Sequence, residues 1–285
     1  MNYSVISDIK CVCTLLELSP SALAEQLGVA RSTVTRILNG STVPGDLFLR
    51  RFYSFAYDNP MCRIDLNQLK VQFALDEHSH LYFHGARNGI EGEIDLSHSR
   101  KELDMGPGFY LGESYSQAAS YIFAYPSSSI YLFSGKKLQG LRVANYGVDL
   151  EWMLLVCYFR KRIDAYASSS LLQSYVEKAK QADVIIAPIA DNNMFETMNQ
   201  FARGQITDLQ AIAALSASTL GKQIVLKTDS ACQAFEIVDR LYLSPEERKD
   251  IEEARKASAL TARDKAKLAI EKYRREGRYI EEILK

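Results

Sequence analysis

The sequence lacks the features of several large protein classes. No apolar run approaches the ~18 residues that a membrane-spanning helix needs, and the first ten residues show no basic stretch followed by an apolar block. We therefore expect no membrane span and no signal peptide, and hence a cytoplasmic protein. Neither sign of charge dominates, because 34 basic and 35 acidic residues leave a net charge of -1. This balance argues against a protein that coats nucleic acid along its whole surface.

Cysteine is scarce, and its spacing excludes the sites that cysteines most often build. No CxxC or CxxH spacing occurs, and the closest pair would point to different faces of a helix. We therefore expect no zinc site and no metal cofactor. An odd, scattered set in mostly apolar surroundings predicts reduced, buried thiols instead of a disulfide framework. These residues are Cys11, Cys13, Cys62, Cys157 and Cys232.

What is present fits a globular protein of about two domains. Hydrophobic residues make up 47% and charged residues 24% of the 285 residues, which is too apolar for a disordered chain. The expected fold class is α+β. We expect an all-α domain over 1–60, a helical connector over 61–79, a mixed α/β domain over 80–243 and a C-terminal helical segment over 244–285.

Residues 1–60 have the pattern of four short helices. Ser7 is suited to cap a helix over 8–18. Ser19 and Pro20 give an N-cap followed by proline at the first helical position, and Gly28 ends that second helix. The other two helices are expected over 31–38 and 46–57. In the connector, the spacing of Leu66, Leu69 and Phe73 predicts one amphipathic helix.

Beyond residue 80 short strands alternate with helices, which favours a mixed core over a regular doubly wound sheet. Trp152, in an apolar stretch, is expected in that core. Ser244 and Pro245 start the C-terminal segment, whose twelve basic and ten acidic residues are typical of a solvated helix pair or a partner-binding appendage. The expected strands are 81–84, 108–111, 130–133, 184–188 and 223–228.

Residues 19–40, SPSALAEQLGVARSTVTRILNG, resemble the helix-turn-helix of the Cro-like phage-repressor family. Ala24 would face the partner helix, Gly28 would form the turn, and Val34 and Ile37 would anchor the second helix. The resemblance implies that the exposed face of this second helix contacts the major groove of DNA. The residues of that face are Arg31, Ser32, Thr33, Thr35 and Arg36.

The alternative for this domain is a compact helical unit that mediates dimer or partner contacts. Five basic and five acidic residues balance over 1–60, whereas DNA affinity needs spare charge to neutralise phosphates. Arg31 and Arg36 must therefore provide much of any DNA binding. Domains of this kind commonly act as homodimers on two half-sites.

Two motifs in the central domain carry chemistry. LYFHGA over 81–86 is an apolar strand with His-Gly near its end, and DMGPGFYLGESYSQAASYI over 104–122 combines a glycine-rich turn, a strand with Tyr110 and a helix with Tyr121. This order, with eleven residues from the first tyrosine to the second, resembles the ADP-ribosyltransferase superfamily, in the His-Tyr-Glu branch of diphtheria-type toxins and poly(ADP-ribose) polymerases. GxGFYL and VIIAPIAD (184–191) are also similar to a less characterised bacterial subfamily.

The resemblance implies NAD⁺ as the substrate and gives each residue a role. His84 would hydrogen-bond the adenosine ribose, and Gly85 would let backbone groups reach the nicotinamide carboxamide. Tyr110 and Tyr121 would stack on the two faces of the nicotinamide ring. Loss of nicotinamide leaves an oxocarbenium-like sugar, so the site must stabilise positive charge and position a nucleophile.

Gln223 stands where this family has a catalytic glutamate, at the start of the strand QIVLKT. A glutamine can hold a ribose hydroxyl by hydrogen bonds, but it cannot act as a general base. Three interpretations stay open: the acceptor needs little deprotonation, another carboxylate serves, or transfer activity is lost. The candidate carboxylates are Glu113, Asp191 and Glu196.

Two functions of different classes follow. One is an NAD-dependent ADP-ribosyltransferase, the toxin of a bacterial toxin–antitoxin or phage-defence module, which modifies a protein or a nucleic acid. An antitoxin protein would neutralise it, with the charged C-terminal segment as a docking site. The other is a DNA-binding transcriptional regulator whose degenerate transferase domain only binds NAD or a related nucleotide. A pure interaction protein with neither activity is the third interpretation.

Overall fold

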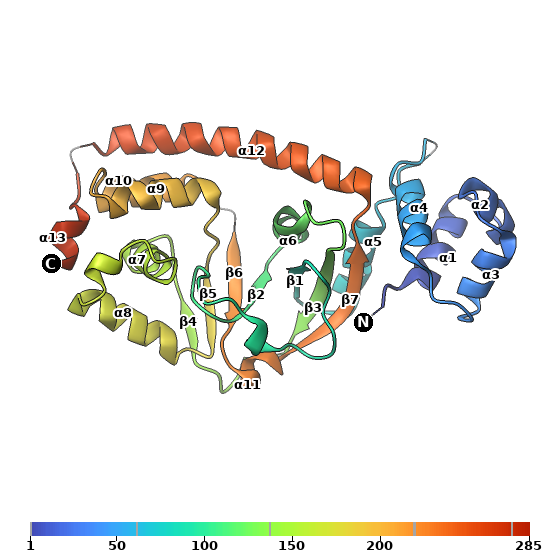
Figure 1. The fold of residues 1–285 in the computed structure, drawn as a ribbon, viewed down its shortest axis with the longest axis horizontal. Helices are drawn as coiled ribbons and strands as arrows, with labels where there is room; N and C mark the ends of the chain where they lie inside the picture. The colour runs from blue at the N-terminus through green and yellow to red at the C-terminus, as the bar shows by residue number, and fades with distance from the viewer. Residues whose placement is uncertain (1, 61, 137, 219–220, 275) are drawn as a thin grey trace. The chain divides into compact units, whose positions relative to one another are not determined.

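The computed structural model describes residues 2–60, 62–136, 138–218, 221–274 and 276–285 (Figure 1). Met61, where the connector was expected to begin, lies outside these ranges. Within these ranges, helices and seven strands confirm the α+β class. The chain divides into two compact units: unit 1 holds residues up to 92, 118–134 and 237–253, and unit 2 holds 93–117, 135–236 and 254–285. In the part of the chain that is described, no helix is both long and apolar enough to cross a membrane.

Four helices form the N-terminal part of unit 1. They are α1 (Val5–Leu15), α2 (Pro20–Gln26), α3 (Arg31–Leu38) and α4 (Asp46–Tyr57). The last two have the bounds that the sequence predicts. Helix α2 also starts as predicted, because the Ser19 hydroxyl accepts a hydrogen bond of 3.1 Å from the Ala22 amide and Pro20 takes the first position.

The prediction for the first helix is wrong in both its bounds and its cap. Ser7 lies inside α1, where its hydroxyl donates to the Ser4 carbonyl instead of capping. The helix begins one turn early because Val5 and Ile9 are both buried, so the apolar face starts before Ser7.

Unit 1 also contains three strands and a further helix. The strands are β1 (Leu81–Ala86), β3 (Ser129–Gly135) and β7 (Phe235–Tyr242), in the order β1-β3-β7, and β1 pairs antiparallel with β3. Helix α5 (Leu66–Glu77) confirms the helix predicted in the connector, but Phe73 is 63% exposed. The predicted buried face is therefore wrong at that position. Strand β7 was not predicted, because three charged residues interrupt its apolar pattern.

A buried cluster of charges joins the helices of unit 1 to β7. The Lys70 ammonium lies 3.0 Å from a carboxylate oxygen of Asp8 and 3.1 Å from one of Asp239. The Tyr53 hydroxyl donates to Asp8, and the Ser4 hydroxyl donates to Asp239. Burial raises the pKa of Asp8, and the opposing effect of Lys70 does not fully offset it. These bonds connect α1, α4 and α5 to one strand.

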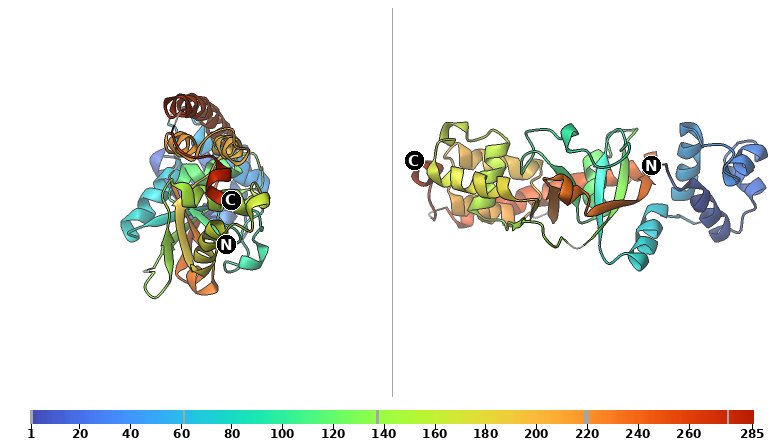
Figure 2. Two further views of the ribbon diagram at one scale, coloured as in Figure 1. Left: turned by 90° about the vertical axis from the view of Figure 1, so that its left-hand side faces the viewer. Right: turned by 90° about the horizontal axis from the view of Figure 1, so that it is seen from below.

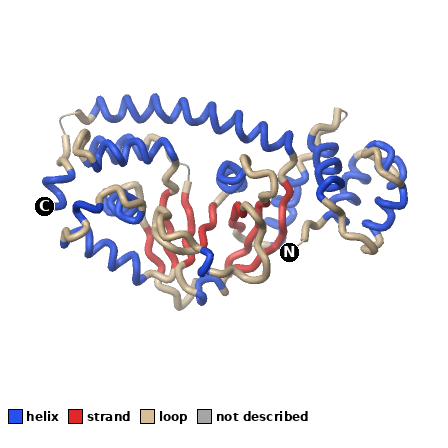
Figure 3. The backbone as a smooth tube through the Cα atoms, viewed as in Figure 1, coloured by secondary structure: helices blue, strands red, loops and turns tan. Residues whose placement is uncertain are grey.

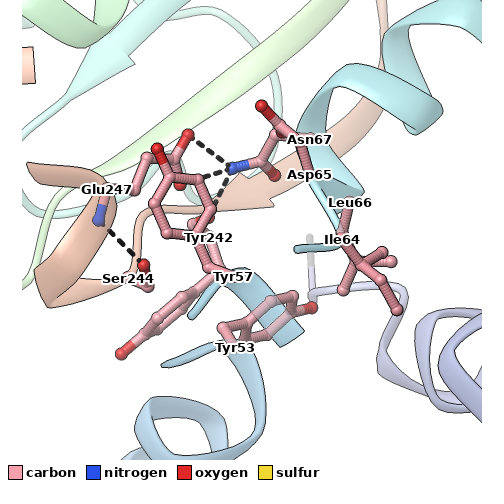
Figure 4. Close-up of a pocket in the computed structure, with 9 residues that line it drawn as sticks. All are labelled: Tyr53, Tyr57, Ile64, Asp65, Leu66, Asn67, Tyr242, Ser244 and Glu247. Carbon is pink, nitrogen blue, oxygen red and sulfur yellow. Dashed lines mark hydrogen bonds between the residues drawn. The ribbon is translucent and has the colours of Figure 1, made fainter. Parts of the chain in front are cut away.

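Beside this cluster lies the small pocket drawn in Figure 4. The ring of Tyr53 stacks on that of Tyr242, with 4.6 Å between centroids. The Asn67 side-chain amide donates to the Tyr242 carbonyl at 2.7 Å and to Glu247 at 3.0 Å. The pocket has a volume of about 10 Å³, which is room for about one water molecule. It therefore holds no organic ligand.

Helix α12 (Pro245–Lys272) begins as predicted, and its first turns fix the end of α6 (Tyr115–Ile122). The Ser244 hydroxyl caps α12 by accepting from the Glu247 amide. From the same turn, the Arg248 guanidinium donates to the backbone of the loop after α6. Its acceptors include the carbonyl oxygens of Ile122, Phe123, Tyr125, Pro126 and Ser128, at 2.8–3.3 Å. Carbonyl groups at the end of a helix have no donor within the helix, and Arg248 supplies one.

Unit 2 is built on four strands, in the order β4-β5-β6-β2. Strand β4 pairs parallel with β5, whereas β6 runs antiparallel to both β5 and β2. Strand β5 has the predicted bounds, and β2 and β6 begin one residue away from their predicted starts; β4, three residues long, was not predicted. The strands are β2 (Phe109–Gly112), β4 (Val143–Asn145), β5 (Val184–Pro188) and β6 (Lys222–Leu226).

Helices pack around these strands and enclose the core of unit 2 (Figures 2 and 3). Trp152 of α7 is fully buried there with Met153, Leu154 and Cys157, as the sequence predicts. All five cysteines are free thiols, but Cys62 is exposed, so the prediction of burial is wrong for that one, which follows Pro60 in the connector. The helices of this unit, apart from α6 and α12, are α7 (Leu150–Phe159), α8 (Ser170–Gln181), α9 (Asn192–Ala202), α10 (Asp208–Ser216), α11 (Asp229–Cys232) and α13 (Ile280–Leu284).

Replacing Arg248 with Met should lower the free energy of unfolding by about 2–4 kcal/mol, because several carbonyl groups lose their donor at once. Urea and thermal unfolding of the full chain measure this. The matched control is Lys249→Met, on the exposed side of the same turn, which should change stability by less than about 0.5 kcal/mol. Equal stability of the two variants would contradict the assignment.

Candidate functional site

Helix α3 presents the face that the sequence predicts. Arg31, Ser32, Thr35 and Arg36 are exposed and Thr33 is half-buried. On the opposite side, the buried side chains of the helix pack into the core of unit 1. The turn before α3 is held from α4, because the Arg51 guanidinium donates to the Gly28 carbonyl at 2.9 Å. This face is therefore free to contact a partner.

In the central region, β1 and α6 approach each other closely at Gly85. A Cβ atom on Gly85 would lie 2.8 Å from the Ala118 carbonyl oxygen and 2.8 Å from a methyl carbon of Ile122. Only glycine fits this approach. This close packing alone requires a glycine at position 85, whether or not a ligand binds nearby. Because side chains alternate along a strand, His84 projects from the other face of β1, opposite Tyr131 of β3.

Tyr121 lies near the end of α6 and is 51% exposed. Arg87, which follows β1 directly, places its guanidinium carbon 5.5 Å from the centre of the Tyr121 ring and 4.1 Å from that of Tyr125. Tyr125 is 36% exposed. Two accessible rings thus lie beside one cation. Arg87 was not predicted, although it lies only two positions after Gly85.

Tyr110 of β2 lies in unit 2 and is tied to the glycine-rich turn. Its hydroxyl donates to the Gly106 carbonyl at 2.5 Å and accepts from the Met105 amide at 3.1 Å. Burial raises the pKa of this hydroxyl further above the neutral range. Gly106 has a positive φ of 74° and packs against the ring of Phe159. The tyrosine therefore stabilises the turn through its hydroxyl.

Gln223 is 6% exposed and takes part in a buried polar network. Its side-chain amide donates to the Pro188 carbonyl at 3.0 Å and to the Asp104 carboxylate at 3.3 Å. Arg160 also donates to Asp104, with nitrogen–oxygen distances of 2.9 and 2.5 Å. The carboxylate is thus compensated by an arginine and an amide. In this position Gln223 acts as a donor between two acceptors.

Lys227 lies just after β6, near the same turn. Its ammonium donates to the Met105 carbonyl at 2.8 Å and lies 5.7 Å from the centre of the Phe159 ring. Burial lowers the pKa of this amine to about 8, because the charged form loses its hydration. Lys227 therefore contacts the same turn as Tyr110, through the Met105 carbonyl.

The three alternative carboxylates have different surroundings. Asp191 caps α9 by accepting from the Met194 amide at 2.8 Å. Glu113 is exposed and accepts from the Lys222 amide at 3.0 Å. Glu196 lies on the exposed side of α9. Among the described residues, no three His, Cys, Asp or Glu side chains form a group that could hold a metal ion.

The predicted residues fall into two groups. His84, Gly85 and Tyr121 lie in unit 1, where Gly85 packs against the helix that carries Tyr121. Tyr110 and Gln223 lie in unit 2, where both belong to the structure around the glycine-rich turn. The contributions of Arg87, Arg160 and Arg248 were not predicted, because a lone arginine gives no spacing signal.

Replacing Gln223 with Glu should destabilise the chain at pH 8 by about 2–4 kcal/mol, because a second carboxylate would face Asp104 and a carbonyl oxygen. The control Gln223→Met removes the hydrogen bonds without adding charge. Urea unfolding should show that the Glu variant is the less stable of the two at pH 8. The difference should shrink at pH 5, where a protonated glutamate can donate. If the Glu variant is as stable at pH 8 as the unaltered chain, Gln223 is not required as a donor.

Comparison with known proteins places the chain in a family. No curated protein and no solved structure matches it. One family model, described as a protein of unknown function (DUF3990), matches residues 80–237. The match begins one residue before β1, ends within β7 and leaves out α1–α5, α12 and α13. Since it covers more than half of the chain, this protein belongs to the DUF3990 family.

Proposed function

We propose that the chain is an NAD-dependent ADP-ribosyltransferase. The observation that carries the proposal is the close packing of Gly85 against α6, the helix that presents the exposed ring of Tyr121. A strand with His-Gly, joined to a helix with an accessible tyrosine, provides backbone groups and a stacking surface for a flat carboxamide ring. The order of these motifs within the segment matched by the family model supports the same reading.

In this proposal each residue of the site has a separate role. Tyr121 stacks on the nicotinamide ring, and the backbone at Gly85 hydrogen-bonds its carboxamide. His84 binds the adenosine ribose, and the stacked tyrosine stabilises the positive charge that develops on the sugar. Gln223 cannot remove a proton from the acceptor. The base is therefore another carboxylate, or the acceptor needs none.

The biological role that fits this activity is that of a toxin in a bacterial toxin–antitoxin or phage-defence module. A transferase that acts inside its own cell needs a neutralising partner. The α12 helix, much of it exposed and charged on both signs, offers a surface for an antitoxin protein. The acceptor is a protein or a nucleic acid, and the exposed face of α3 would bring the enzyme close to DNA.

Incubation with labelled NAD and cell lysate should transfer label to macromolecules. Tyr121→Ala and His84→Ala should each reduce this labelling at least about 10-fold, because stacking and hydrogen bonds at the reacting ligand are lost. The matched control is His98→Ala, which replaces a histidine that is 86% exposed at its side chain. Labelling that persists in both variants, or is absent from the unaltered protein under all conditions, would contradict the proposal.

A second function is favoured by the contacts of Gln223. Because its amide is already bound to Asp104 and Pro188, the domain fits a nucleotide sensor without transfer activity. The chain would then be a transcriptional regulator that contacts DNA through Arg31 and Arg36 of α3. NAD or a related nucleotide would alter that binding.

A gel-shift titration with the chain's own promoter region tests this second function. Arg31→Ala and Arg36→Ala should each weaken binding and reduce the slope of log affinity against log salt by about 1, if each arginine neutralises one phosphate. Arg50→Ala on α4, also exposed, is the control and should leave the slope unchanged. The absence of a specific shift at moderate salt, with and without NAD, would rule out the regulator.

A further inference from the structure

One group of side chains in unit 1 combines accessible aromatic surface with a cation. The Arg87 guanidinium lies over the Tyr125 ring at 4.1 Å and beside the Tyr121 ring at 5.5 Å. Arg87 itself is exposed, as are 36% of Tyr125 and 51% of Tyr121. We propose that these three residues bind an anionic nucleotide, with Arg87 on its phosphates and the tyrosines against its ring. We call this group the Arg87 platform.

The charge of Arg87 is available, and a comparison within the same unit makes this clear. Arg63 also stacks on a tyrosine, with its guanidinium carbon 3.9 Å from the centre of the Tyr57 ring. Its charge, however, is neutralised by Asp250, whose carboxylate lies 2.8 Å away. Over the described ranges, Arg87 has no such ion-pair partner. The same stacking arrangement thus leaves one arginine neutralised and the other able to bind an anion.

The platform is held rigid from two sides. The loop that carries Tyr125 receives the hydrogen bonds of the Arg248 guanidinium, including 2.8 Å to the Tyr125 carbonyl. Helix α6, which carries Tyr121, packs directly on Gly85, two residues before Arg87. A surface that is ordered before binding loses little entropy when a ligand arrives. The rings and the cation are therefore positioned in advance.

The chemistry of the platform selects one class of ligand. A guanidinium forms paired hydrogen bonds with phosphate oxygens, and tyrosine rings stack on heterocycles. A nucleoside lacks the anion, and inorganic phosphate lacks the ring. A nucleotide has both. The inference rests on the proposed function only in naming the diphosphate of NAD as the group that Arg87 contacts. When ADP is the probe, its adenine takes the place on the tyrosines that the nicotinamide ring of NAD has in the proposed function.

Calorimetric titration of the full chain with ADP and with adenosine tests the platform. ADP should bind about 10- to 100-fold more tightly than adenosine, the range expected for hydrogen bonds to a charged group. Arg87→Gln should reduce ADP affinity to the adenosine level and leave adenosine unchanged, whereas Arg87→Lys should restore part of the difference. Tyr125→Leu should weaken both ligands. Circular dichroism checks that each variant is folded.

Arg63→Gln is the matched control and should leave the preference for ADP intact, because its charge is already paired. The inference is overturned if the unaltered chain does not prefer ADP, if Arg87→Gln keeps the preference, or if Arg63→Gln loses it equally. NAD labelling separates the two proposals. A chain that shows the Arg87-dependent preference but transfers no label contradicts only the transferase. A chain that transfers label with an unchanged KM for NAD in Arg87→Gln contradicts only the platform.

Discussion

Much of unit 1 depends on one guanidinium. Arg248 leaves the first turn of α12 and donates to the carbonyl groups that follow α6, so a helix end and the loop after it are fixed by a residue more than a hundred positions away. Without those bonds the part-buried carbonyl groups of Ile122, Phe123 and Ser128 would lose their donor, which is costly. Because Tyr121 and Tyr125 lie on either side of this helix end, their placement, and with it the aromatic surface beside Arg87, follows from the same contact.

The buried charges at Lys70 have a related effect on the helical part of unit 1. Lys70 lies between two carboxylates, one on α1 and one on β7. Breaking one such pair leaves an uncompensated buried charge, which costs more than the pair gains by forming. The elements are therefore connected as one piece, so the helical part of unit 1 and a strand that continues into α12 share one packed interior. A change in the packing of β7 would therefore affect α1 through Asp239, Lys70 and Asp8.

How much of this could be predicted from the sequence depends on the range of the interactions involved. The bounds of α3, α4 and β5 and the start of α12 were predictable, because caps, prolines and apolar spacing act within a few residues. The start of α1 was not, since it depends on the burial of Val5 against distant helices. Nor was the exposure of Phe73, because Leu66 and Leu69 on the same predicted face pack against the core while Phe73 is 63% exposed. At the candidate site, the motifs indicated His84, Gly85 and the tyrosines. No local pattern shows that α6 packs directly on Gly85, or that Arg87 lies beside two tyrosine rings.

The identity of residue 223 affects both the hydrogen bonding of the core and the chemistry that the domain can perform. Its strand position corresponds to that of a catalytic glutamate in the family that the motifs resemble, yet its surroundings call for a donor. The Pro188 carbonyl and the Asp104 carboxylate are both acceptors, and a glutamate there would have to be protonated to satisfy them. A glutamine meets the requirement at any pH. The arginine that compensates Asp104 and the amide that completes its hydrogen bonding form one network, so the identity of residue 223 is set by its neighbours in the core as well as by any ligand. If the domain transfers ADP-ribose, residue 223 therefore does not remove the proton from the acceptor. Either another carboxylate removes it, or the acceptor reacts without a base.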